Sequence, residues 1–333
     1  MPNTYGDISP RTAAYASAML LERAEPFMCM ARFGQQHPIP ANNTLSIKWR
    51  RYNGFVPNTN PLSEGVTPAP DSLSHTDVNA TLQQYGRYVR ITDVIEDTHE
   101  DPVLTQHTEI MGELAGQTAE LVVYNVLKAG TNQLFSGGTS RATVNAAITT
   151  TVLNRAIRQL KRQNAKMMSK MLAGTDKVGT APIRPAFVAF CHPDVQTDIE
   201  ALTGFKTPSE YGTYNMLADN EFGSYKEIRF FGSTLYAPFL AAATTTGSGS
   251  TFMTNGGTGT GVPDVYPMVI CGADSYGVVS LAGNRSVTPM VSNPKVSESD
   301  PLAQRGSVGF KMYGTAAILN DAWMVRIETA VNQ

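Results

Sequence analysis

The chain has 333 residues, with 26 Lys and Arg against 28 Asp and Glu, so its net charge is −2 when histidine is neutral. This balance excludes a strongly basic nucleic-acid-binding protein, because such proteins carry excess cations to replace phosphate counterions. Charged residues form 16% of the chain and hydrophobic residues 42%. The charged share is below the roughly 25% of an average protein, which favours oligomerisation; a monomer rich in uncharged polar side chains is the alternative.

Membrane and disulfide signals are absent from the sequence. No run approaches the about 18 to 20 apolar residues that a membrane span needs, and residues 1–10 lack a secretory signal pattern. We therefore expect a protein of the cytosol. Cys29, Cys191 and Cys271 lie far apart, so we expect reduced, buried thiols and neither a disulfide framework nor a zinc site.

The first 95 residues predict an arm and a hairpin that extend away from the body of the subunit. Residues 12–25 have helical apolar spacing, and a single short helix is marginal alone, so we interpret residues 1–40 as a docking arm. Residues 44–53 and 81–95 alternate apolar and polar side chains, as strands do. If these two strands pair, they form a hairpin of roughly 30 to 45 Å, which should lie on a neighbouring surface because isolated hairpins are barely stable.

Two helices are predicted next. Asp101 and Pro102 signal a helix start and Gly130 a stop, which indicates one helix of about 40 Å at 1.5 Å per residue. Its apolar residues at helical spacing are Ile110, Leu114, Leu121, Val122 and Val126. A second helix is predicted over residues 150–170. Its polar side carries a basic stripe: Arg155, Arg158, Lys161, Arg162, Lys166 and Lys170.

The second half of the chain predicts a mixed domain. We expect strands at residues 186–191, 227–236, 265–271, 276–281, 308–319 and 323–329, a short helix over residues 194–202, and a flexible glycine-rich loop over residues 242–261. A tight turn at Asn320 and Asp321 joins the last two strands.

The sequence contains none of the common catalytic motifs. There is no phosphate-binding loop, dinucleotide fingerprint or nucleophile elbow. The His99-Glu100 pair precedes His107 by too many positions for a helical zinc motif, and Cys191 and His192 should point to opposite faces of a strand. We therefore predict no catalytic, cofactor-binding or metal-binding residues.

Two charged features have competing interpretations. The acidic run is Asp93, Glu96, Asp97, Glu100 and Asp101. We interpret it as a solvated turn at a helix start, where negative charge is favoured, with a docking patch for a cationic partner as the alternative. The basic stripe lacks interleaved aromatic residues, so a solvated face or an ion-pair surface between subunits is favoured over nucleic-acid binding.

Several segments together are similar to a podophage-type family of tailed-phage major capsid proteins. They are Tyr5–Pro10, Thr81–Tyr85, Ile91–Ile95, Asp97–Pro102, Leu127–Gly130, Leu160–Ala165, Asp300–Gly306 and Ile318–Trp323. The resemblance implies an α+β chain with the HK-type (Johnson) capsid fold. It divides the chain into an N-terminal arm (1–40), an E-loop hairpin (41–95), a P-domain spine helix (96–130), an A-domain of mixed sheet and helices (131–283) and closing strands (284–333).

The same resemblance implies a function without catalysis. It indicates a major capsid protein that forms hexamers and pentamers and closes an icosahedral shell around viral double-stranded DNA, without sequence-specific DNA binding. Its partners would be other copies of itself, a portal, a separate scaffolding protein and a decoration protein, and it would assemble in the host cytoplasm. The alternatives are an encapsulin-like nanocompartment shell and, from another class, a soluble enzyme of unrecognised type.

The hairpin supplies a hypothesis about contacts between subunits, in which Arg50 and Arg51 pair with the acidic run near Asp97 of an adjacent copy. The candidate contact residues are Trp49, Arg50, Arg51, Tyr85, Arg87, Asp93, Glu96 and Asp97. The glycine-rich loop is interpreted as a tip near a symmetry axis or on the surface of a ring of subunits.

Overall fold

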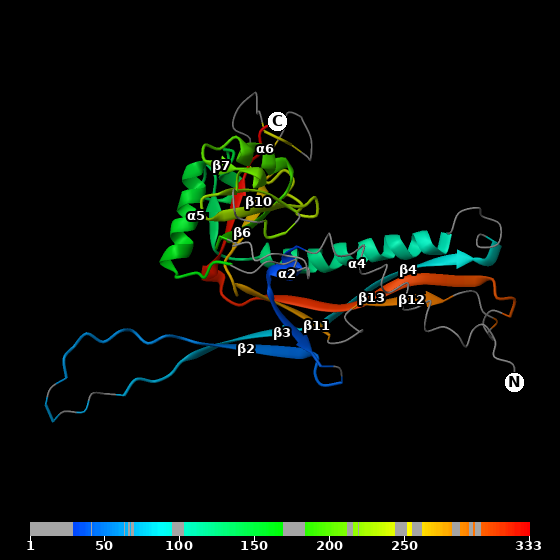
Figure 1. Ribbon diagram of the computed structural model, residues 1–333, viewed down its shortest axis with the longest axis horizontal. Helices are drawn as coiled ribbons and strands as arrows, with labels where there is room; N and C mark the ends of the chain where they lie inside the picture. Colours follow the sequence, from blue (N-terminus) through cyan, green and yellow to red (C-terminus); the bar gives the residue numbers. More distant parts are fainter. Residues whose placement is uncertain are drawn as a thin grey trace.

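The computed structural model shows an elongated subunit in which a long helix links a spine sheet to a separate mixed domain, and a hairpin projects from the base of both (Figure 1). The structure describes residues 29–40, 42–62, 64–65, 67, 70–94, 103–168, 184–211, 216–218, 220–243, 252–254, 262–281, 287–292, 296 and 301–333. The expected arm helix, most of the glycine-rich loop and the acidic run beyond residue 94 lie outside these ranges.

Helix α4 (Val103–Leu127) is the spine of the molecule. Its start signal lies outside the described residues, and the chain turns at Gly130, whose N–H donates to the carbonyl of Leu127 at 3.1 Å. The buried stripe is Thr108, Met111, Gly112, Ala115, Gly116, Glu120, Val123, Tyr124 and Leu127. Of the apolar residues expected from the sequence, Leu114, Leu121 and Val126 pack against the cores, whereas Ile110 is 56% exposed. Small side chains form much of the contact face because they let the helix approach the sheet closely.

The spine sheet lies under the first half of α4. Its members are β1 (Gln35–Ile39), β11 (Tyr276–Leu281), β13 (Arg305–Ile318), β12 (Val287–Ser292) and β4 (Gln83–Thr92), and the short helix α2 (Met30–Phe33) precedes β1. The long strand β13 pairs with β4, β12 and β11. Met111 and Ala115 of α4 pack with Val308, Phe310 and Met312 of β13.

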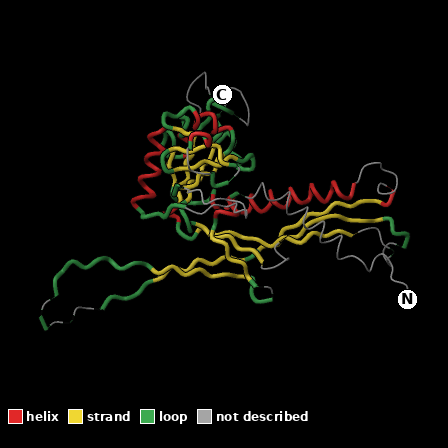
Figure 2. The backbone as a smooth tube through the Cα atoms, viewed as in Figure 1, coloured by secondary structure: helices red, strands yellow, loops and turns green. Residues whose placement is uncertain are grey.

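The hairpin differs from the expected one in its second strand. Strand β2 (Ser46–Tyr52) pairs antiparallel with β3 (His75–Thr81), and the chain then passes through Leu82 into β4. The alternating segment that was expected to complete the hairpin is a strand, but it pairs with β13 in the spine sheet. Figure 2 shows the hairpin as two short strands followed by a long loop that reaches away from the body.

The mixed domain is built on a seven-stranded sheet with helices packed on both faces. The strand order is β5 (Gln133–Phe135), β14 (Met324–Thr329), β10 (Tyr266–Cys271), β6 (Phe187–Cys191), β9 (Ile228–Gly232), β8 (Glu221–Tyr225) and β7 (Phe205–Lys206). Helices α5 (Thr150–Arg162) and α6 (Asp194–Glu200) pack on one face, while Val123, Tyr124 and Leu127 of α4 pack on the other. Single 3₁₀ turns complete it: η3 (Arg141–Thr143), η4 (Pro208–Glu210) and η5 (Asp321–Trp323).

One further expectation needs correction, and one is confirmed. Helix α5 ends at Arg162, eight residues before the expected end, and Asn164 follows with a φ of 52°. The predicted turn at Asn320 and Asp321 is confirmed, since it joins β13 of the spine sheet to β14 of the seven-stranded sheet. The turn therefore connects the two sheets. Within the described residues, no helix is both long and apolar enough to cross a membrane.

Candidate assembly surfaces

The hairpin carries apolar side chains that the rest of its own subunit leaves exposed. Beyond β2 and β3 the loop is closed at its base, where the N–H of Asn53 donates to the carbonyl of Ser74 at 3.0 Å. The exposed side chains are Tyr52, Phe55, Val56, Leu62 and Leu73, with exposed fractions of 59 to 87%. Several large apolar side chains exposed on one projecting segment are typical of an interaction site.

Trp49, one of the predicted contact residues, fixes the base of the hairpin to its own subunit. The indole packs on Gly277 of β11, where an added Cβ would lie only 2.7 Å from the ring. His37 of β1 stands edge-on to the same ring, with ring centroids 5.8 Å apart. Trp49 therefore sets the direction in which the hairpin leaves the spine sheet.

Arg50 has a partner within the hairpin. Its Nε and Nη2 donate to the two carboxylate oxygens of Asp77 at 2.9 and 3.1 Å, and Lys48 Nζ lies 3.5 Å from the same carboxylate. This hydrogen bonding lowers the pKa of Asp77 to about 2 and raises the pKa of Arg50. Arg51 points to the opposite face of β2 and is exposed, with Nη1 3.5 Å from the carbonyl of Leu319.

The remaining predicted contact residues do not gather near the hairpin. Tyr85 packs in the apolar cluster between α4 and the spine sheet, whereas Arg87 is exposed on β4. Asp93 follows β4, whose end lies at the far end of the spine sheet from the hairpin (Figure 1). Glu96 and Asp97 lie outside the described residues. One subunit therefore does not bring the hairpin arginines to Asp93.

A shallow groove crosses the spine sheet on strands β4, β13 and β12. It encloses about 430 Å³ and is lined by Gln84, Tyr85, Gly86, Arg87, Tyr88, Met290, Gly309, Phe310 and Lys311. Tyr88 and Met290 are 63% and 48% exposed. Gly86 and Gly309 contribute no side chains, so the floor of the groove is backbone.

A buried carboxylate that the sequence did not single out joins three parts of the fold. Glu120 of α4 accepts hydrogen bonds from the backbone N–H groups of Met30 and Ala31 at 2.7 and 3.2 Å and from the hydroxyl of Tyr236 at 2.6 Å. Burial raises its pKa despite these donors. The available signal was its position: Glu120 continues the spacing of Gly112 and Gly116 on the buried side of the helix.

A second buried carboxylate lies between two arginines. Glu328 of β14 accepts two hydrogen bonds of 2.7 Å from Arg141, and Arg326 Nε lies 2.9 Å from the same carboxylate. The Arg141 guanidinium also stacks on Phe239, 3.5 Å from the ring centroid. This cluster fixes the segment after α4 against the last strand.

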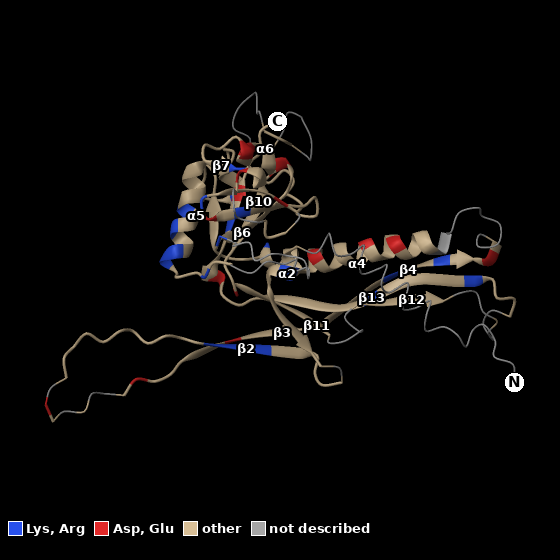
Figure 3. Ribbon diagram, viewed as in Figure 1, with Lys and Arg blue, Asp and Glu red and all other residues tan. Residues whose placement is uncertain are grey.

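A basic groove follows the outer side of α5. Three adjoining hollows there all include Lys226, and each of Lys161, Lys206 and Arg184 lines two of them. Arg158 and Arg162 line the hollow along α5. The expected basic stripe is exposed at Arg155, Arg158, Lys161, Arg162 and Lys166, and Lys170 lies outside the described residues. Figure 3 shows the blue residues along α5 on one side of the mixed domain.

The only adjacent cysteine and histidine form no nucleophile pair within the described residues. Cys191 is buried, its Sγ lies 3.8 Å from the carbonyl of Phe231, and burial raises the pKa of the thiol. His192 Nδ1 instead lies 3.1 Å from an Asp194 oxygen. In the part of the chain that the structure describes, no three His, Cys, Asp or Glu side chains gather as metal ligands.

Comparisons with solved structures show the fold. The chain is similar to the capsid of Ralstonia phage GP4, with a TM-score of 0.61, 11% identity and coverage of 90% of this chain and 88% of that one. It is also similar to the cyanophage Pam1 capsid, with a TM-score of 0.57, 15% identity and coverage of 93% and 92%. An encapsulin complex from Synechococcus elongatus matches with a TM-score of 0.51, 11% identity and coverage of 91% and 88%.

Comparison of the sequence with families identifies the chain more specifically. No curated protein sequence matches it. The family model for phage capsid proteins matches residues 76–327, from the second hairpin strand to the last strand of the mixed domain. The α+β subunit with a projecting hairpin, a spine helix and a mixed domain thus has the HK-type capsid fold, and the chain belongs to the phage capsid protein family.

Proposed function

We propose that this phage capsid protein is the major shell subunit, whose copies assemble as hexamers and pentamers into an icosahedral container for double-stranded DNA. The observation that carries the proposal is the hairpin, since its exposed apolar side chains have no use in a monomer. Burial contributes about 25 cal/mol per Å² of apolar surface, and obligate interfaces exceed about 2,000 Å². A projecting hairpin enlarges each interface beyond the reach of a compact body.

The hairpin of one copy would lie on the spine sheet of the next. The groove lined by Tyr88 and Met290 offers an exposed apolar surface with a backbone floor. Contacts between two different surfaces of identical subunits run head to tail, and they close into rings when the rotation allows. The groove and the hairpin are such a pair of different surfaces.

Arg51 is the hairpin cation that best suits the acidic run of an adjacent subunit. Arg50 is already held by Asp77, whereas Arg51 is exposed on the other face of β2. Arg51→Glu should therefore lower the yield of shells. Arg51→Lys is the matched control, because it keeps the positive charge. Unchanged shell yields in both variants would show that Arg51 makes no contact in the interface.

The proposal also covers the partner proteins of the shell and the compartment in which it assembles. The family supports a structural rather than a catalytic role, self-assembly and a place in the virion capsid. We add that a portal, a separate scaffolding protein and a decoration protein take part, and that the shell assembles in the host cytoplasm. Co-expression with each candidate partner, followed by sedimentation of the particles, tests these additions.

The variant that tests the hairpin most sharply is Val56→Asp, because Val56 is 87% exposed in the subunit. It should leave the subunit folded by circular dichroism and strongly reduce the fraction that sediments as shells. Val56→Ile keeps the apolar surface and should assemble normally. Normal assembly of Val56→Asp would contradict a role of the hairpin loop in the interface.

A further inference from the structure

The basic groove on α5 concentrates positive charge in a nearly neutral chain. Its exposed cations are Arg158, Lys161, Arg162, Arg184, Lys206 and Lys226, and its carboxylates are Glu210 and Glu227. The buried Arg229 also lines it and is paired with Glu221 at 3.2 Å. Lys161 pairs with Glu227 at 2.7 Å, and Glu210 accepts from the backbone N–H of Thr207 at 3.1 Å. Arg158 and Arg162 make no ion pair with any residue that the structure describes.

The charge of the subunit is therefore distributed unevenly. Without the six exposed cations and two carboxylates of the groove, the chain's 26 cations and 28 carboxylates become 20 cations and 26 carboxylates. Identical copies can neutralise such an uneven distribution when the basic side of one meets an acidic side of the next. This arrangement needs the head-to-tail contacts of a ring.

The position of the groove indicates which macromolecule it meets. Helix α5 and the hairpin lie on the same side of the molecule (Figures 1 and 3). If the hairpin reaches a neighbour, as the proposed function holds, α5 faces that same neighbour. Nucleic acid is the weaker candidate, because Tyr211, the aromatic residue lining the groove, already lies under Arg229, 5.1 Å from its guanidinium carbon.

Helix α6 offers the complementary surface. It contains Asp194, Asp198 and Glu200 and no cation. Asp194 accepts from the hydroxyl of Tyr266 at 2.8 Å and Asp198 from the side-chain amide of Asn332 at 2.7 Å. Glu200 is exposed, and its hydrogen bond of 2.7 Å comes from Gln196 on its own helix. Glu200 is therefore the carboxylate of α6 best placed to meet a partner.

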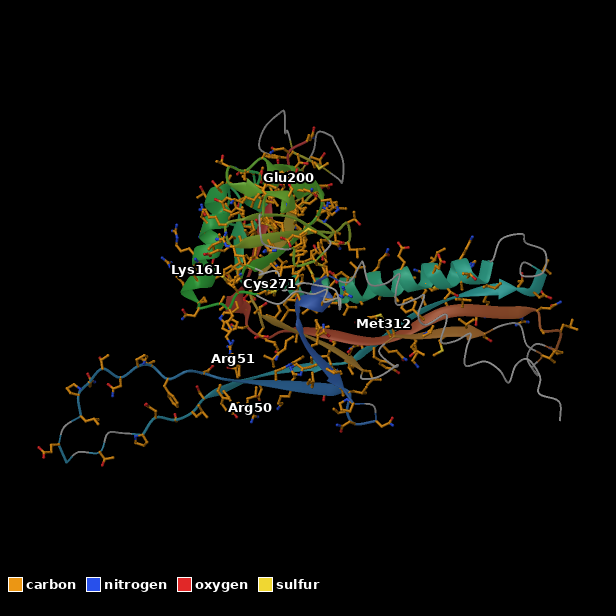
Figure 4. All side chains as sticks on the ribbon, in the orientation of Figure 1. Arg50, Arg51, Lys161, Glu200, Cys271 and Met312 are labelled. Carbon is orange, nitrogen blue, oxygen red and sulfur yellow. The ribbon has the colours of Figure 1, made fainter. Side chains whose placement is uncertain are left out.

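We propose that the basic groove of one subunit binds the acidic face of α6 of the adjacent copy in the same ring, with Glu200 near Arg158. Figure 4 shows Lys161 of the groove and Glu200 on different parts of the mixed domain, so the two surfaces do not meet within one subunit. The inference rests on the proposed function, because it specifies one contact of the assembled ring.

The test compares two arginines of the same helix. Arg158→Glu should lower the yield of sedimenting shells about tenfold, since like charges would then face each other. Arg155→Glu is the matched control: Arg155 is also exposed on α5 but does not line the groove, so its yield should stay within about twofold of the unmodified chain. Circular dichroism of the unassembled subunits verifies that both variants fold.

Charge exchange tests the assigned partner. Glu200→Lys should also reduce assembly, and the double variant Arg158→Glu/Glu200→Lys should recover it, because each ring contact then regains an opposite pair. Normal assembly of Arg158→Glu, or no recovery in the double variant, would overturn the inference. If Arg158→Glu forms normal shells that contain no DNA, the groove binds nucleic acid, and this result would also overturn the inference. Failure of the unmodified chain to form shells would instead contradict the proposed function.

Discussion

The hydroxyl of Tyr236 donates a 2.6 Å hydrogen bond to the carboxylate of Glu120, joining the mixed domain to the middle of the spine helix. The same carboxylate holds the N–H groups of Met30 and Ala31 at the start of α2, and the hydroxyl of Tyr276 donates to the carbonyl of Met30 at 2.7 Å. A single buried acid thus fixes the relative positions of the two sheets and of the segment that enters the spine sheet.

Glu120→Ala should destabilise the subunit by about 3 to 5 kcal/mol, because it leaves three buried donors without an acceptor. Denaturant unfolding of the unassembled subunit measures the change. Glu113→Ala, on the more exposed side of the same helix, should cost less than about 1 kcal/mol. Equal losses in the two variants would contradict the special role of Glu120.

The pH dependence of stability should contain a contribution from Glu120. Because its pKa is raised in the folded state, the protonated form is favoured there. Its contribution is fully present below the ordinary glutamate pKa and is lost as the pH rises through the raised value. The free energy of unfolding of the unmodified subunit, relative to Glu120→Gln, should therefore increase as the pH falls from neutral towards 4.5. A difference that stays constant or decreases would contradict this sign.

Glu328→Gln should cost about 3 to 5 kcal/mol, because Arg141 and the buried Arg326 would lose their shared counter-charge. The matched control is Glu227→Gln, whose partly exposed carboxylate pairs with Lys161 and should contribute less than about 1 kcal/mol. Thermal or denaturant unfolding of both variants gives the comparison. A similar small effect at both positions would show that the Glu328 cluster is not a structural centre.

Gly309→Ala should loosen the pairing of β4 with β13, because the new Cβ would lie 2.5 Å from the carbonyl oxygen of Arg87. We expect a loss of about 1 to 3 kcal/mol and faster hydrogen exchange along β4. Gly314→Ala on the same strand has its nearest neighbour, Met312, at 3.6 Å and should be tolerated. Equal behaviour of the two variants would contradict the close packing at Gly309.

Local signals predicted single elements well. The stop signal at Gly130 predicts the end of the spine helix to within three residues, since the helix ends at Leu127. The strand expected over residues 276–281 is β11 with the same bounds. Turn residues, caps and buried apolar runs act over a few residues, so they can be interpreted without knowledge of the rest of the chain. The buried strands β6 and β10 were found for the same reason.

Strand partners and buried polar contacts could not be predicted in this way. Strand β3 is exposed at most positions, so it lacks the alternation that marks a half-buried strand. The alternation in β4 is clearer, so the sequence predicts β4 instead of β3 as the partner of β2. The pairing of β4 with β13 joins segments more than 200 residues apart. Glu120 contacts Tyr236 across a sequence separation of 116 residues, and Trp49 similarly contacts Gly277 of a distant strand.

The most direct measurement of the central claim is electron microscopy of the expressed full chain, followed by reconstruction of the particles. We predict closed icosahedral shells built from rings of six and five subunits, in which each hairpin lies on the spine sheet of a neighbour. Subunits that fold by circular dichroism but remain monomeric, or shells whose hairpins contact only their own subunit, would contradict the account.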